Sequence, residues 1–64
     1  MSTVLGDDFS ILRAMFAEEE GVDADEILRR YPDHRLERVR DTDEPTYRKW
    51  LEDAYQWKRR KAMH

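Results

Sequence analysis

The apolar positions of this chain recur at helical spacings, and groups of polar or helix-ending residues separate the apolar segments. Phe9, Leu12 and Phe16 are three and four residues apart, which places them on one side of a helix. This spacing predicts an amphipathic helix over residues 7–20 that packs against another element. The polar residues expected to point away from the core are Arg13, Glu18, Glu19 and Glu20.

A glycine, a capping residue and a proline mark the bounds of a short second helix, which we predict over residues 24–31. Gly21 is suited to the left-handed position that follows the first helix. Asp23 is a natural N-cap, and Glu26 could return a hydrogen bond to the cap amide in a capping box. Pro32 cannot continue the helix, so the helix should end at the residue before it. The residues expected to face inward are Ile27, Leu28 and Tyr31, and those expected to face outward are Arg29 and Arg30.

Two further helices follow the proline. Leu36 and Val39 are three residues apart, which predicts a third helix over residues 33–41 with either Asp33 or His34 as its cap. Pro45 suits the first position of a fourth helix, predicted over residues 45–61. The apolar arc of this fourth helix is expected to contain Tyr47, Trp50, Leu51, Ala54 and Trp57.

These elements predict an all-α fold with residues 1–64 as a single helical domain. The second and third helices, joined by a proline turn, have the pattern of a helix-turn-helix. We therefore expect a small three-helix, helix-turn-helix-like core followed by a longer amphipathic C-terminal helix. A chain of 64 residues has room for one small core, and without cysteines no disulfide supports it.

The segment from Gly21 to Arg40 resembles a small trihelical family of prokaryotic proteins that is associated with antitoxin-type proteins. The shared pattern is a glycine, a capping residue, two acids, Ile-Leu, Tyr-Pro and a short Leu-Glu-x-Val-Arg helix. The resemblance implies a helix-turn-helix fold and a role as a DNA-binding transcription regulator or antitoxin-like protein. The chain departs from the family at His34 and Arg35, where the family has a leucine and a threonine cap.

Charge is distributed unevenly between two parts of the sequence. The acidic first part, residues 1–28, holds eight acids and one base, and the basic second part, residues 29–64, holds eleven bases and seven acids. Such asymmetry is typical of proteins that bind nucleic acid or an oppositely charged partner, although it also keeps a small domain in solution. The net charge of −3 and the isoelectric point near 5.3 disfavour DNA binding over the whole surface.

Arginines on the third helix make DNA the leading predicted partner. Arginine pairs with guanine edges and with phosphate oxygens, so a helix that presents several arginines can contact a duplex. A homodimer is also compatible with this prediction. The candidate DNA-binding residues are Arg29, Arg30, Arg35, Arg38, Arg40, Lys58, Arg59, Arg60 and Lys61.

The alternative hypothesis is a protein-binding adaptor or inhibitor, such as those that phages use. Tryptophan, tyrosine and arginine dominate the energetics of protein interfaces, and the fourth helix carries all three. The two tryptophans could instead fill the core. The candidate protein-interface residues are Glu18, Glu19, Glu20, Trp50, Tyr55 and Trp57.

We expect neither catalysis nor a bound metal or cofactor. His34 and His64 are the only side chains that could act as bases near neutral pH, and no activated nucleophile or phosphate-binding loop accompanies them. His34 and Glu37 are three residues apart, but a metal would need further ligands. Because the chain has no signal peptide and no long apolar run, we expect a cytoplasmic protein without a membrane partner.

Overall fold

A computed structural model describes residues 3–62 of the chain, with side chains described from residue 8 onward. His64 and the other terminal residues lie outside this range. All regular structure within it is helical, which confirms the all-α prediction. The helices are α1 (Thr3–Glu20), α2 (Ala24–Arg30), α3 (Asp33–Thr42) and α4 (Glu44–Ala62).

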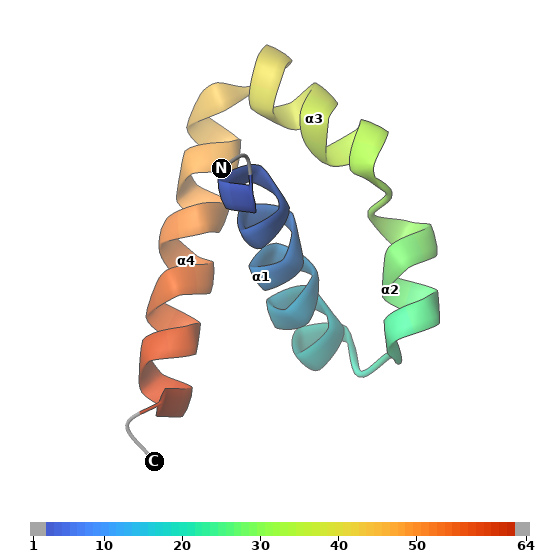
Figure 1. Cartoon of the computed structure of the whole chain (residues 1–64), viewed down its shortest axis with the longest axis vertical. Helices are drawn as coiled ribbons and strands as arrows, with labels where there is room; N and C mark the ends of the chain where they lie inside the picture. Colours follow the sequence, from blue (N-terminus) through green and yellow to red (C-terminus); the bar gives the residue numbers. More distant parts are fainter. Residues whose placement is uncertain (1–2, 63–64) are drawn as a thin grey trace.

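Helix α1 lies between α4 and α2, and α3 crosses one end of the molecule (Figure 1). α4 packs against both α1 and α3, so the longest helix connects the first and third elements. The first turn of α4 therefore lies beside α3, and its last turn lies at the opposite end of the molecule (Figure 1).

The bounds of α2, α3 and α4 lie within one residue of the predicted ones. α1 begins at Thr3, four residues before the predicted start. A single interior glycine, here Gly6, costs a helix only about 1 kcal/mol, so it does not end the helix. α4 begins at Glu44, which places Pro45 at the second helical position instead of the first. The amides of the first turn have no intrahelical acceptor, so a proline is tolerated there too.

The core is built mainly from α1, whose predicted apolar face is buried. Leu12 and Leu36 are completely inaccessible to solvent. Phe16 stacks on Tyr31 with 4.5 Å between ring centroids and meets the edge of Trp50 at 5.2 Å. The buried residues are Phe9, Ile11, Leu12, Met15, Phe16, Ile27, Leu36, Tyr47 and Ala54.

The turn between α1 and α2 follows the prediction closely. Gly21 has a φ of +69°, and its amide and that of Val22 both donate to the Ala17 carbonyl oxygen, at 2.9 and 3.1 Å. The Asp23 carboxylate accepts a hydrogen bond of 2.8 Å from the Glu26 amide. The reciprocal half of the capping box is absent, because the Glu26 carboxylate is bound to arginines of α2 instead.

The turn between α2 and α3 differs from the prediction in its cap. Pro32 is the N-cap residue of α3 and supplies no side-chain hydrogen bond, so neither Asp33 nor His34 caps this helix. Both lie inside its first turn. The Asp33 carboxylate is instead ion-paired with Arg13.

Arg13 was predicted to point away from the core, and this prediction is wrong. Its side chain is only 16% exposed, and its Nε donates a 2.7 Å hydrogen bond to the Tyr31 carbonyl oxygen. The same guanidinium pairs with Asp33, so Arg13 connects α1 to the turn between α2 and α3.

Two other predictions about orientation are also corrected. Leu28 was expected to face inward but is 51% exposed, because Ile27 alone on α2 points directly into the core. Arg40 was expected at the surface but is half-buried, with its guanidinium 5.9 Å from the Phe9 ring centroid and 3.3 Å from the Asp41 carboxylate.

Candidate nucleic-acid interface

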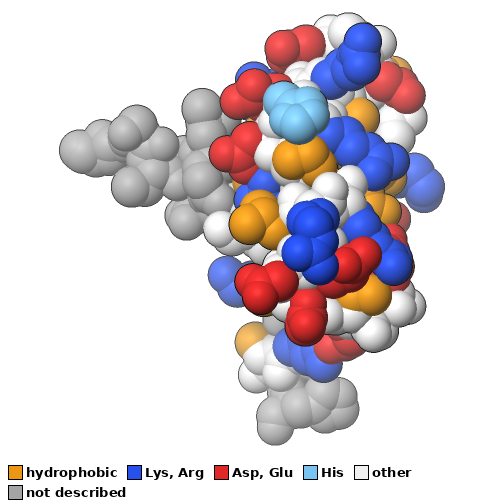
Figure 2. Space-filling view, turned by 90° about the vertical axis from the view of Figure 1, so that its right-hand side faces the viewer, with side chains coloured by type: hydrophobic (Ala, Val, Ile, Leu, Met, Phe, Trp, Pro, Cys, Tyr) orange, Lys and Arg blue, Asp and Glu red, His pale blue; other side chains and the backbone are white. Residues whose placement is uncertain are grey.

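The corner between α2 and α3 holds a shallow hollow of about 470 Å³ with a strongly basic lining. No acidic residue lines it. Figure 2, which looks onto this side of the molecule, shows several Lys and Arg side chains over the face with acids next to them. The lining residues are Arg29, Arg30, Pro32, His34, Arg35, Arg38 and Val39.

Arg35 and Arg38 of α3 are the arginines of this corner that form no ion pair among the described residues. Arg35 donates a 2.6 Å hydrogen bond to the Arg30 carbonyl oxygen, and its guanidinium lies 4.7 Å from the Tyr31 ring centroid. These contacts hold its side chain across the turn. Arg38 is exposed and has no ion pair among the described residues, so its guanidinium can bind a ligand without breaking an internal contact.

The arginines of α2 are already bound to carboxylates. Glu26 accepts hydrogen bonds from Arg29 at 2.8 Å and from Arg30 at 3.0 Å. Arg30 also donates to Glu20 at 2.5 Å, and the Tyr31 hydroxyl donates to the same carboxylate at 2.7 Å. These two arginines therefore reach a ligand only by sharing or exchanging their carboxylate partners.

The remaining predicted DNA-binding residues lie elsewhere. Arg40 is turned toward Phe9, as described above. The run of cations from Lys58 to Lys61 occupies the last turns of α4, at the end of the molecule opposite α3 (Figure 1). Lys61 pairs there with Glu18 at 2.5 Å. The fold thus brings together four of the nine predicted residues, which are Arg29, Arg30, Arg35 and Arg38.

The residues of the alternative, protein-binding hypothesis are dispersed between core and surface. Trp50 is partly buried against the core. The Trp57 indole donates a 2.9 Å hydrogen bond to Glu18, and the Tyr55 hydroxyl donates one of 2.6 Å to Asp8. Tyr55 is nevertheless 42% exposed. A groove between α1 and α4 is lined by Ser10, Ile11, Ala14, Tyr55, Trp57 and Lys58.

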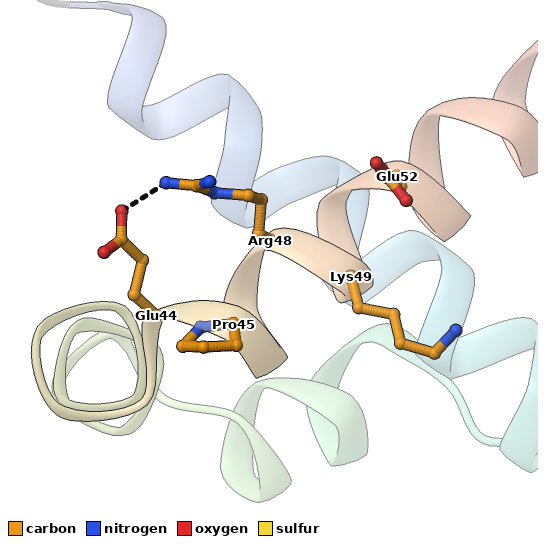
Figure 3. Close-up of a pocket in the computed structure, with 5 residues that line it drawn as sticks. All are labelled: Glu44, Pro45, Arg48, Lys49 and Glu52. Carbon is orange, nitrogen blue, oxygen red and sulfur yellow. Dashed lines mark hydrogen bonds and ion pairs between the residues drawn. The ribbon is translucent and has the colours of Figure 1, made fainter.

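A hollow at the start of α4 offers no convergent chemistry. Glu44 and Arg48 form a 2.6 Å ion pair, and the side chains of Lys49 and Glu52 extend in different directions from the helix (Figure 3). With its main cation and anion bound to each other, this hollow presents no unbalanced charge to a ligand.

Sequence reasoning missed the exposed side of α2 and the apolar grooves along α1. Leu28 follows the buried Ile27 by one residue and so lies about 100° around the helix, at the edge of the apolar arc. The available signal in the sequence was the charge of its neighbours Asp25 and Arg29, both of which are exposed in the structure.

No known protein family, curated protein or solved structure matches this chain. Among the residues with described side chains, no three potential ligands gather into a metal-binding group. Within the described part of the chain, no helix has the length and apolar character needed to cross a membrane. The function is therefore inferred from the geometry of the chain's own residues.

The internal ion pairs make stability dependent on pH. The Tyr31 hydroxyl and Arg30 lower the pKa of Glu20 below its ordinary value of 4.5, and Arg29 and Arg30 do the same for Glu26. A carboxylate with a lowered folded-state pKa stabilises the fold above its unfolded pKa, and this stabilisation is lost as pH falls through the folded value. The melting temperature should therefore decrease as pH is lowered below about 4.5.

Thermal melts across this range check that expectation. Glu20→Gln should flatten the acid part of the pH profile, because the amide does not titrate. Glu19→Gln is the matched control, since Glu19 is exposed and has no ion pair among the described residues. Parallel profiles for wild type and Glu20→Gln would contradict the assignment.

Proposed function

We propose that the protein is a small non-enzymatic regulator that binds DNA through the corner between α2 and α3. The observation that supports this proposal is the hollow lined by four arginines and a histidine, with no acid in its lining. Arginine guanidinium groups bind phosphate oxygens through paired hydrogen bonds, and such contacts supply most of the affinity for duplex DNA. The corner therefore has the chemistry of a phosphate-binding surface.

The start of α3 adds to this chemistry. Pro32 caps the helix without a side-chain hydrogen bond, so the Asp33 and His34 amides receive no side-chain acceptor, whereas the Arg35 and Leu36 amides donate to the Pro32 carbonyl oxygen. Free amides and the helix dipole favour an anion at a helix N-terminus. Because Arg35 and Arg38 extend from the first two turns of the same helix, a phosphate bound there would contact both amides and guanidinium groups.

In this proposal α2 and α3 act as a helix-turn-helix, with α3 as the helix nearest the duplex. Leu36 anchors α3 in the core, while Arg35 and Arg38, three residues apart, share an exposed face of the helix. The chain's net charge of −3 requires its acidic surfaces to point away from DNA, so binding should depend on this corner alone. Affinity should therefore fall steeply as salt rises.

A gel-retardation experiment at low salt tests this function. Arg38→Ala should weaken binding to a preferred sequence by about 1 to 3 kcal/mol, because all the hydrogen-bond donors of this guanidinium are available to DNA. Arg59→Ala removes the same charge at the far end of α4 and is the matched control. The proposal fails if no DNA is retarded, or if both variants bind equally to wild type.

A second candidate function is protein binding through the groove between α1 and α4. The observation that favours it is the aromatic wall of that groove, because Tyr55 and Trp57 of α4 line it together with residues of α1. If this function holds, Tyr55→Lys abolishes capture of a protein partner, whereas Gln56→Lys, an exposed neighbour, retains it. Equal capture by both variants would exclude this surface.

A further inference from the structure

A second groove, between α1 and α2, has a mainly apolar lining. Ala14 and Ala24 are exposed along it, and Leu28 stands at its rim with 51% of its surface accessible. Arg13 also lines the groove, but its guanidinium is held by Tyr31 and Asp33. The lining residues are Ser10, Arg13, Ala14, Ala17, Ala24, Ile27 and Leu28. The groove thus combines a cavity lined by small side chains with a large exposed leucine at its edge.

The charged residues beside Leu28 would attract those of a second copy of the chain if the two α2 helices lay antiparallel. α2 has acids in its first turn and arginines in its last turn. Asp25 is exposed and has no ion pair among the described residues, and the Arg29 side chain is 72% exposed. If two α2 helices lie antiparallel, the acidic end of each faces the basic end of the other, and the helix dipoles also align favourably. This pattern favours a second copy of the chain over an unrelated partner.

We propose that the groove between α1 and α2 is the contact surface of a homodimer. Two-fold symmetry places Leu28 of each copy in the groove of the other, against Ala14, Ala17 and Ala24. The same symmetry pairs Asp25 of each copy with Arg29 of the other, so every ionic contact occurs twice. The exposed leucine and the cavity are thereby buried together, which removes apolar surface from water on both copies.

The dimer does not depend on DNA binding. Arg35 and Arg38 lie on α3 and are not among the residues that line the groove, so the dimer contact does not use them, and Arg29 alone serves both surfaces. Arg29 keeps its hydrogen bond to Glu26 while its other nitrogens donate to Asp25 of the second copy. The dimer therefore presents two arginine corners, and either inference can fail without the other.

Analytical ultracentrifugation of the full chain over a wide concentration range tests the dimer. The wild type should sediment as a monomer–dimer equilibrium, and Leu28→Glu should raise the dissociation constant at least about tenfold by placing a charge in an apolar groove. Gln56→Glu adds the same charge at an exposed position of α4 and should leave the constant unchanged. A wild type that stays monomeric at every concentration overturns the proposal.

Exchanging the charges at positions 25 and 29 distinguishes this antiparallel dimer from dimers with another contact surface. Asp25→Arg should weaken the dimer about tenfold, because it places two arginines opposite each other at both symmetry-related sites. Combining Asp25→Arg with Arg29→Asp restores opposite charges across the axis and should return the constant to within about threefold of wild type. A double variant as weak as Asp25→Arg overturns the antiparallel pairing, and circular dichroism of each variant verifies that α2 still forms.

Discussion

Replacing Leu36 by alanine should lower the free energy of unfolding by about 2–5 kcal/mol. Leu36 is completely buried and is the one residue of α3 that is fully in the core. Deleting a buried leucine side chain costs about 2–5 kcal/mol, through lost burial and the cavity left behind. A domain of this size has a free energy of unfolding of roughly 3–10 kcal/mol, so the loss is a large share of the total. Urea denaturation followed by far-UV circular dichroism measures it.

The control for this prediction is Leu36→Met, which preserves most of the volume and should cost less than about 1.5 kcal/mol. A difference between the two variants identifies packing as the cause. If Leu36→Ala unfolds at the same urea concentration as wild type, α3 is not anchored through this residue.

Replacing Arg13 by methionine should cost about 2 kcal/mol or more, which is a large effect for a charged residue. The variant keeps the length of the side chain but leaves the Tyr31 carbonyl oxygen without its donor in a half-buried place. It also removes the one cation that connects α1 to the turn between α2 and α3 among the described residues. Denaturant unfolding of Arg13→Met gives the cost directly.

Asp33→Asn separates the two contacts of Arg13. The Asp33 side chain is 70% exposed, and an exposed ion pair contributes about 0–1 kcal/mol, so this variant should be close to wild type. An Asp33→Asn cost as large as that of Arg13→Met would assign the effect to the ion pair and not to the Tyr31 hydrogen bond.

The helices were predictable because local chemistry determines where they begin and end. Gly21, Asp23 and Pro32 act through their own backbone geometry and hydrogen bonds, which need no knowledge of distant residues. The cap of α3 was missed because Asp33 is bound to Arg13, a residue 20 positions away. The tertiary ion pair with Arg13 thus outweighs the local preference of Asp33 for the N-cap position.

Side-chain orientation and the candidate site depended on packing that the sequence alone does not show. Whether Leu28 is inside or outside depends on how far α1 covers α2, and α1 covers only the arc around Ile27. Likewise, the cations at 58–61 and those of α3 belong to one basic part of the sequence. They were grouped together because their charge is alike, and the length of α4 places them at opposite ends of the molecule.

The charged residues that form ion pairs in the folded state also attract each other in the unfolded chain. Five of the seven ion pairs between described residues join the acidic first part of the sequence to the basic second part. Such opposite charges attract each other before any core forms, over a range of about 10 Å in 0.1 M salt. The denatured ensemble at low salt is therefore drawn together by the same charges. Added salt weakens attraction in both states, so the free energy of unfolding depends on salt less than the number of ion pairs suggests.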